Sequence, residues 1–157
     1  MQGYSILNSK ETKKLLERIK MQYGIKELKF DYSFMLNKDK LYAVSKDFDF
    51  NATGRGINNA GVYFARIIDG KIRLSIEGSQ IIGEHAEKNI IEINSEQITK
   101  WVAGIDVEVK EEYDGFVLVK YKDDFFGSGK IADGRLLNFV PKERRIYNLS
   151  SGSRTGN

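Results

Sequence analysis

The chain has 157 residues, of which 41% are hydrophobic, and it carries a formal net charge of +3 and no cysteine. This length suits one domain or two small ones, because domains most often run from about 50 to 200 residues. The lack of cysteine excludes disulfides, thiolate metal sites and cysteine nucleophiles. Since there is no apolar run of the roughly 20 residues that span a bilayer and no secretory signal pattern, we expect a soluble, cytoplasmic protein.

The charges are segregated along the chain. Residues 1–30 carry seven basic against three acidic side chains, and residues 119–157 carry eight against four. The stretch between them holds ten basic and fifteen acidic residues. Positive charge gathered toward both ends indicates a polyanionic partner, although a solvated surface of scattered charges is the competing interpretation.

The first third of the chain predicts one helix. Asn8 followed by Glu11 has the spacing of a capping box, and Gly24 stands where a left-handed residue ends a helix. The helix predicted over residues 8–23 has apolar residues on one face at Leu15, Leu16, Ile19 and Tyr23.

Alternating apolar residues then predict a small antiparallel sheet. The alternation over residues 28–34 and the segment "KLYAVS" indicate two strands. The segments "VYFARII" and "KIRLSIEG" flank Asp69-Gly70, which favours a hairpin with a type I′ turn. One helix against this sheet makes the first domain, which we place at residues 1–88.

The segment between these strand pairs, residues 47–61, predicts a long loop. Its stretch "DFDFNATGRGIN" matches the first ligand positions of a calcium-binding EF-hand, but Ala52 replaces the turn glycine and Asn58 replaces the bidentate glutamate. Its glycines lack the lysine and serine of a phosphate-binding loop. We therefore expect neither calcium nor nucleotide here, although Arg55 has the reach to contact RNA or a protein.

The second half predicts a small β-barrel with one short helix. After the strand "NIIEI", Ser95 is a suitable cap for a helix over residues 95–103, which Gly104 ends. Its buried stripe is Ile98, Trp101 and Val102, so core packing is favoured over base stacking for the tryptophan. The segments "IDVEV", "GFVLVKY", "FFGSGKIA" and "RLLNFV" follow as short strands with close turns.

This order of elements over residues 90–146 resembles the PUA domain, a small pseudo-barrel that binds RNA. The stretch "IEINSEQITKWVAGIDVEV" is similar to the opening strand, helix and glycine turn of the family, and "FVLVKYKDDFFGSGKIADG" to its central hairpin. One departure is Tyr113-Asp114-Gly115, which replaces the Gly-Asp that commonly precedes the central strand. Gly115 can still supply the tight bend.

In the first half, "ETKKLLERIK", "DKLYAVSK" and "KIRLSIEGSQII" in this order resemble the N-terminal α/β domain of small two-domain PUA proteins of ribosome biogenesis from archaea and eukaryotes. In addition, "VPKERRI" is similar to the PUA portion of the Nol/Nop/Sun RNA cytosine-5 methyltransferases. The resemblance implies an α+β protein with a PUA-like domain at residues 89–147 and a flexible tail at 148–157. It implies a non-catalytic protein that binds rRNA or tRNA, with pre-ribosomal proteins or an RNA-modifying enzyme as further partners.

A candidate RNA surface follows from the last strands. Glycine within a strand often marks a close backbone approach, which predicts that Gly127 and Gly129 admit a nucleic-acid backbone. Neighbouring cations would neutralise phosphates. The alternative is that the glycines serve a bulge and the cations are merely solvated. The predicted RNA-binding residues are Lys120, Lys122, Gly127, Gly129, Lys130, Arg135, Lys142, Arg144 and Arg145.

The sequence favours no enzymatic function. His85 is the single histidine, and no serine lies in a Gly-x-Ser-x-Gly motif. Asp123 and Asp124 are adjacent turn residues, an unsuitable arrangement for acid and base roles. We expect no catalytic residue, no metal and no cofactor. Two alternatives to a free-standing RNA binder stay open: a targeting subunit for a separate cytosine-5 methyltransferase, and a protein-interaction adaptor that has lost RNA contacts.

Overall fold

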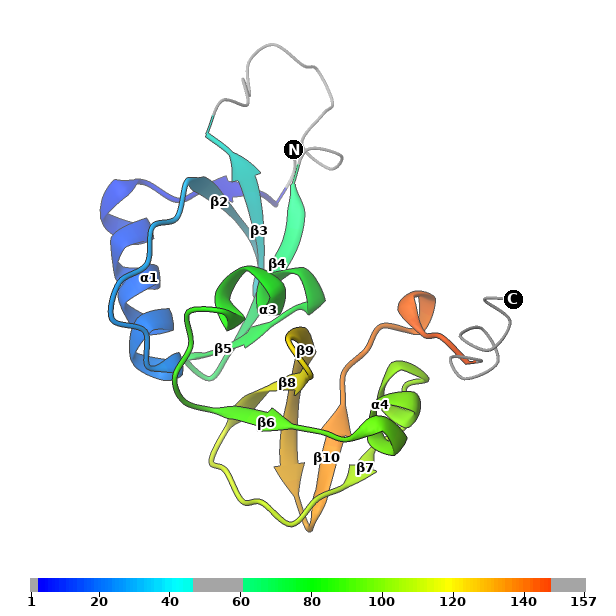
Figure 1. Cartoon of the computed structure of the whole chain (residues 1–157). Helices are drawn as coiled ribbons and strands as arrows, with labels where there is room; N and C mark the ends of the chain where they lie inside the picture. The colour runs from blue at the N-terminus through cyan, green and yellow to red at the C-terminus, as the bar shows by residue number, and fades with distance from the viewer. Residues whose placement is uncertain (1–2, 47–60, 148–157) are drawn as a thin grey trace.

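The computed structural model describes residues 3–46 and 61–147, and it shows an α+β protein built on two five-stranded sheets (Figure 1). The first sheet is antiparallel, with the strand order β1-β2-β3-β4-β5. These strands are β1 (Ser5–Ile6), β2 (Tyr32–Asn37), β3 (Lys40–Ser45), β4 (Val62–Ile68) and β5 (Lys71–Leu74). The helix α1 (Ser9–Tyr23) packs on this sheet.

The predicted first helix and its caps are confirmed. The Asn8 side chain accepts a hydrogen bond from the backbone of Glu11, and the Glu11 carboxylate accepts one from the backbone of Asn8. Gly24 ends α1 in the left-handed conformation at φ 66°. The buried face carries Leu15, Ile19 and Tyr23, so the helical spacing of these residues positions α1 against the sheet.

The strand predicted from residue 28 begins only at Tyr32. Phe30 precedes β2 but turns back over it, and its ring stacks on that of Phe34 at 4.8 Å. Both rings also contact Phe64 of β4, at 5.4 and 5.3 Å between centroids. The alternating apolar residues before Tyr32 therefore do not extend the strand, and Phe30 instead belongs to an aromatic cluster with Phe34 and Phe64.

The predicted β4–β5 hairpin is present, but its second strand is shorter than expected. Asp69 and Gly70 have φ values of 50° and 79°, as a type I′ turn requires. The strand β5 stops at Leu74, because the Ser75 side chain accepts a hydrogen bond from the backbone N–H of Gly78 and begins a helix. That helix, α3 (Ile76–Gly83), lies in a segment that the sequence analysis assigned partly to a strand.

The second sheet is curled and has the order β6-β8-β9-β10-β7. The strand β6 runs parallel to β8, and the other pairs are antiparallel. The strands match the segments predicted from the sequence. They are β6 (Ile90–Glu92), β7 (Val107–Glu108), β8 (Phe116–Tyr121), β9 (Asp124–Ala132) and β10 (Arg135–Asn138).

The helix α4 (Ser95–Val102) packs on this second sheet through the predicted stripe. Ile98, Trp101 and Val102 are buried there, and Trp101 is 0% exposed. Its indole N–H donates to the carbonyl of Phe126 at 2.8 Å, which confirms core packing. The predicted cap is corrected by one residue: Asn94 caps the helix, because its side chain and that of Gln97 bond each other's backbone N–H.

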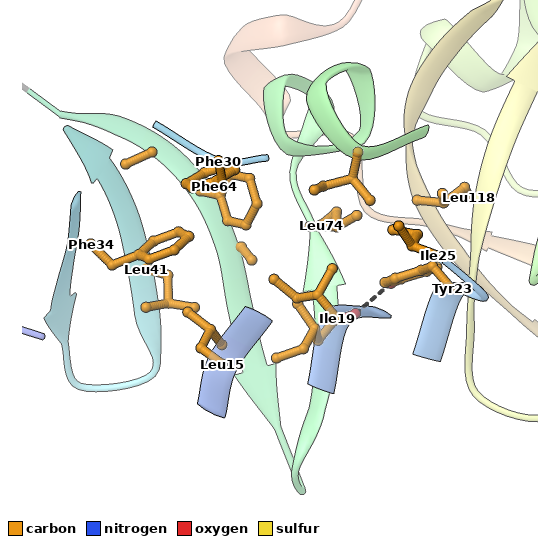
Figure 2. Close-up of a cluster of buried hydrophobic side chains, with 14 of the residues drawn as sticks. Leu15, Ile19, Tyr23, Ile25, Phe30, Phe34, Leu41, Phe64, Leu74 and Leu118 are labelled. Atoms are coloured by element: carbon orange, nitrogen blue, oxygen red, sulfur yellow. Dashed lines mark hydrogen bonds between the residues drawn. The ribbon is translucent and has the colours of Figure 1, made fainter. Parts of the chain in front are cut away.

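The two sheets are joined through α3, which lies between them in Figure 1. Gly83 comes so close to Phe125 of β9 that a Cβ on the glycine would lie 2.5 Å from the ring. Leu118 of β8 belongs to the hydrophobic core around α1, and Figure 2 shows it beside Ile25 and Tyr23. The seam between the sheets is therefore an apolar interface, with a buried hydrogen bond that the Gly127 N–H of β9 donates to the Ser79 hydroxyl of α3.

Several predictions fall outside the described residues. They concern the calcium-like stretch of residues 47–58 with Arg55, most of the glycine-rich loop up to residue 61, and the tail at 148–157. Within residues 3–46 and 61–147, no helix is long and apolar enough to span a membrane.

Candidate nucleic-acid interface

The predicted basic cluster lies on a segment that follows β10 and ends in a short 3-10 helix, η1 (Lys142–Arg144). Two contacts fix this segment beside α4. The Asn138 side chain donates to the carbonyl of Trp101 at 2.8 Å, and the N–H of Ile146 donates to the carbonyl of Val102 at 2.7 Å. The basic residues are thus held on a folded part of the molecule, which we call the C-terminal segment, residues 139–146.

The three cations of this segment have different surroundings. Lys142 is exposed. Arg144 forms an ion pair with Glu77 of α3 at 2.9 Å, and this hydrogen-bonded contact raises the pKa of Arg144. Arg145 covers Gly104, leaving no space for a Cβ there, and its Nε donates to the carbonyl of Val140 at 3.2 Å. Arg144 therefore links the segment to α3, while Arg145 also packs against the turn after α4.

One residue that the sequence analysis missed joins this cluster. The guanidinium of Arg73, on β5, lies over the ring of Phe139 with 4.3 Å between its central carbon and the ring centroid. Arg73, Phe139 and Arg144 line a small cavity of about 40 Å³ between the two sheets. Arg73 was not predicted because it lies in the middle of the chain, where acidic residues outnumber basic ones. The signal that could have found it is its alternation with Ile72 and Leu74, which are buried and so place Arg73 on the opposite face of β5.

An apolar hollow lies next to these cations. It has a volume of about 180 Å³, and Arg144, Phe126 and Val140 are among the residues that line it. A guanidinium beside an apolar hollow suits a nucleotide, whose phosphate is charged and whose base has a flat π-face that packs against aromatic side chains. The arrangement provides both kinds of contact within one short stretch of surface.

The remaining predicted cations are not brought to one place. Lys120 and Lys122 lie at the β8–β9 turn, where Lys120 faces Glu92 at 4.0 Å. Arg135 lies at the β9–β10 turn, at the opposite end of β9, and pairs with Asp106 at 2.9 Å. Lys130 is exposed and has its ammonium 6.0 Å from the ring centroid of Phe116. These four residues do not form a single cluster with the C-terminal segment.

The two glycines that were predicted to admit a nucleic-acid backbone are both buried. A Cβ on Gly129 would lie 2.7 Å from Leu136 and 3.0 Å from Trp101, so this strand position is filled by protein side chains. Gly127 has φ +90°, and its N–H donates to the Ser79 side chain of α3 at 2.8 Å. Packing and hydrogen bonding within the protein therefore account for both glycines.

Residues 88–146 match the sequence model of a domain family described as "Methyltransferase RsmF PUA domain". Residues 88–146 are thus similar to a PUA domain, and for brevity we call them the PUA domain. No curated protein matches the chain significantly. The match starts just before β6 and ends with the last residue of the C-terminal segment.

The matched residues include the whole curled sheet and the basic C-terminal segment. This match confirms the resemblance inferred from the spacing of residues 90–146, and domains of this class support RNA binding in general. All nine residues predicted to bind RNA lie within it, whereas Arg73 and Glu77 belong to the first half of the chain. In the two described ranges, no group of three or more His, Asp or Glu side chains is placed to hold a metal ion.

Proposed function

We propose that this protein binds structured RNA, either rRNA or tRNA, and acts in ribosome biogenesis or RNA modification without catalysing a reaction. The match of residues 88–146 to a PUA domain is the observation that carries the proposal. The basic surface of the C-terminal segment supports it, because cations on a folded scaffold neutralise phosphates with little loss of conformational entropy.

The C-terminal segment supplies the contacts that we propose. Lys142 is exposed and free to reach a phosphate, and Arg144 presents a planar guanidinium at the edge of the apolar hollow. Glu77 neutralises part of the charge of Arg144 in the free protein. An RNA phosphate would compete with Glu77 for this guanidinium, so RNA binding would weaken the contact between the segment and α3.

A second candidate function is that of a targeting subunit for a separate RNA cytosine-5 methyltransferase. The observation that favours it is that the matching family is the PUA domain of a methyltransferase. In this role the protein would hold the RNA while another chain transfers the methyl group. Partners in either function would be RNA together with pre-ribosomal proteins or the modifying enzyme.

The test is direct binding of the full chain to tRNA and to rRNA fragments, measured by fluorescence anisotropy at two salt concentrations. The expected result is saturable binding that weakens at the higher salt concentration, because counterions return to the RNA on dissociation. A duplex DNA of matched length serves as the control. Absence of RNA binding at low salt would refute the proposal and leave the protein adaptor as the remaining function.

A further inference from the structure

A second group of cations lies in a cleft on the seam between the two halves of the molecule. We call it the seam cleft and define it by Arg18, Lys71, Lys88, Asp114 and Phe116, which line it. The cleft has a volume of about 390 Å³. Its walls come from α1, the β4–β5 turn, the chain entering β6 and the start of β8, so both sheets contribute to it.

The seam cleft is strongly basic. Arg18, Lys71 and Lys88 are exposed, and Asp114 is the one acidic residue among those that line the cleft. Lys130 adds a fourth cation at the Phe116 wall. Among the ion pairs of the described residues none involves these four, in contrast to Arg135 and Arg144, which each pair with a carboxylate. The cleft therefore holds positive charge that the folded protein leaves uncompensated.

Close backbone approaches hold these cations in place. The Arg18 guanidinium donates to the carbonyl of Gly70 in the β4–β5 turn. Gly115 has φ +91°, and a Cβ there would lie 3.2 Å from the Lys71 ammonium nitrogen. A Cβ on Gly24 would lie 2.9 Å from Cγ of Lys88. Arg18 is thus oriented by a neutral carbonyl that leaves its charge uncancelled, and both lysines lie close to the backbone of a glycine.

The wall from the first half is fixed to the wall from the PUA domain. Gln22 exchanges two hydrogen bonds with the backbone of Ile72, both of 2.8 Å. The Asn89 side chain donates to the carbonyl of Gln22, and the carbonyl of Tyr23 accepts from the N–H of Glu87 at 2.9 Å. Because these contacts tie α1 to both β5 and the entry of β6, the backbone segments that carry the three cations are held together before any ligand arrives.

We propose that the seam cleft binds the phosphodiester backbone of the RNA that the protein recognises, an inference that rests on the proposed function. The cleft also lies close to the C-terminal segment, because the ring centroids of Phe116 and Phe139 are 6.1 Å apart. Arg73 in turn lies over the ring of Phe139. One RNA would thus contact the N-terminal helix and the PUA domain together.

The test compares two triple variants of the full chain that lose the same charge. The cleft variant is Arg18→Gln, Lys71→Gln and Lys88→Gln. The control variant is Lys10→Gln, Lys29→Gln and Lys110→Gln, at exposed positions that do not line the cleft. RNA affinity is measured over a range of salt concentrations, and circular dichroism checks that each variant is folded.

The cleft variant is expected to bind RNA at least about tenfold more weakly at 0.1 M salt. The slope of log affinity against log salt should fall by about 2 to 3, since each of the three lost phosphate contacts contributes roughly 0.7 to 0.9. The control variant should stay within about threefold of the wild type. If the cleft variant unfolds, two other variants take its place. The first keeps the charge through Arg18→Lys, Lys71→Arg and Lys88→Arg, and its RNA affinity should be unchanged. The second is the single variant Lys71→Gln, and its RNA affinity should be reduced.

Equal RNA affinity of the cleft and control variants would refute the cleft inference while leaving the proposed function intact. A wild-type protein that does not bind RNA would instead refute the proposed function. Competition with poly-glutamate separates RNA from an acidic protein as the occupant. Displacement of RNA by poly-glutamate at equal charge concentration would overturn the assignment to RNA, and failure to displace it supports the assignment.

Discussion

Ser79 of α3 accepts a hydrogen bond of 2.8 Å from the backbone N–H of Gly127 in β9, and this buried contact joins the first half of the chain to the PUA domain. The Ser79 side chain is 0% exposed and also donates to the carbonyl of Ile76 at 2.7 Å. A single hydroxyl therefore satisfies a strand N–H that water does not reach.

Replacement of Ser79 by alanine should destabilise the protein by about 1–3 kcal/mol, because it leaves the N–H of Gly127 buried without a partner. Urea unfolding measures the change. Ser95→Ala, at an exposed position of α4, is the matched control and should change the free energy of unfolding by less than about 0.5 kcal/mol. Equal stability of the two variants would show that the seam does not depend on this hydrogen bond.

Gly129→Ala tests the packing role assigned to this glycine. The added Cβ would meet Leu136 at 2.7 Å, so we expect a loss of about 1–3 kcal/mol from overpacking. The additional change Leu136→Ala removes the obstructing atoms, and the double variant should lose less than the sum of the two single losses. RNA affinity of the folded variant should be unchanged. Weakened RNA binding at full stability would restore the original prediction of a backbone contact at Gly129.

Tyr23 makes stability sensitive to alkaline pH. Its hydroxyl donates to the carbonyl of Ile72, and burial raises the pKa of Tyr23 above its ordinary value. A raised pKa in the folded state means that the contribution of Tyr23 is complete below the unfolded pKa of about 10 and is lost as the pH rises further. Tyr23→Phe should therefore cost about 1 kcal/mol at pH 8, from the lost hydrogen bond.

Above about pH 10 the advantage of the wild type over Tyr23→Phe should shrink by up to about 1.4 kcal/mol per pH unit. Urea unfolding at pH 8 and 10.5 measures the difference. Tyr147→Phe, at a side chain that is 64% exposed, controls for general alkaline effects. A difference between wild type and Tyr23→Phe that is the same at both pH values would contradict this explanation.

Glu77→Gln should strengthen RNA binding. The substitution removes the carboxylate that pairs with Arg144 at 2.9 Å and frees the guanidinium for a phosphate. The pair is partly exposed, with side chains 44% and 36% exposed, so its loss should change stability by less than about 1 kcal/mol. We expect a several-fold gain in affinity in the anisotropy assay. Glu96→Gln, an exposed change of equal charge on α4, should give a smaller gain.

The parts of the fold that depend on local signals could be predicted from the sequence. The first helix begins at the capping box of Asn8 and Glu11 and ends at Gly24, as predicted. Asp69-Gly70 likewise forms the expected hairpin turn. The helix α3 was missed because its cap, Ser75, follows directly on a strand and its sequence "IEGSQIIG" contains two glycines. These glycines serve close approaches to Phe64 and Phe125, which only the tertiary packing reveals.

The candidate site was predictable only in part, because charge along a chain does not determine which cations meet in space. The basic C-terminal segment was visible in the sequence, and so was the positive charge of residues 1–30. Whether Lys120, Arg135 and Arg144 are free or neutralised depends on carboxylates more than twenty residues away in the chain. The meeting of Arg18, Lys71 and Lys88 likewise depends on how the two sheets pack.

The most direct test of the account is an NMR titration of the labelled full-length protein with the RNA that binds best in the anisotropy assay. We predict that the largest amide shifts fall on the C-terminal segment, residues 139–146, and on the residues around Arg18, Lys71 and Lys88, and that they shrink together as salt is added. Shifts confined to the β8–β9 turn, or the absence of any shift at RNA saturation, would contradict the claim that this protein binds RNA through these surfaces.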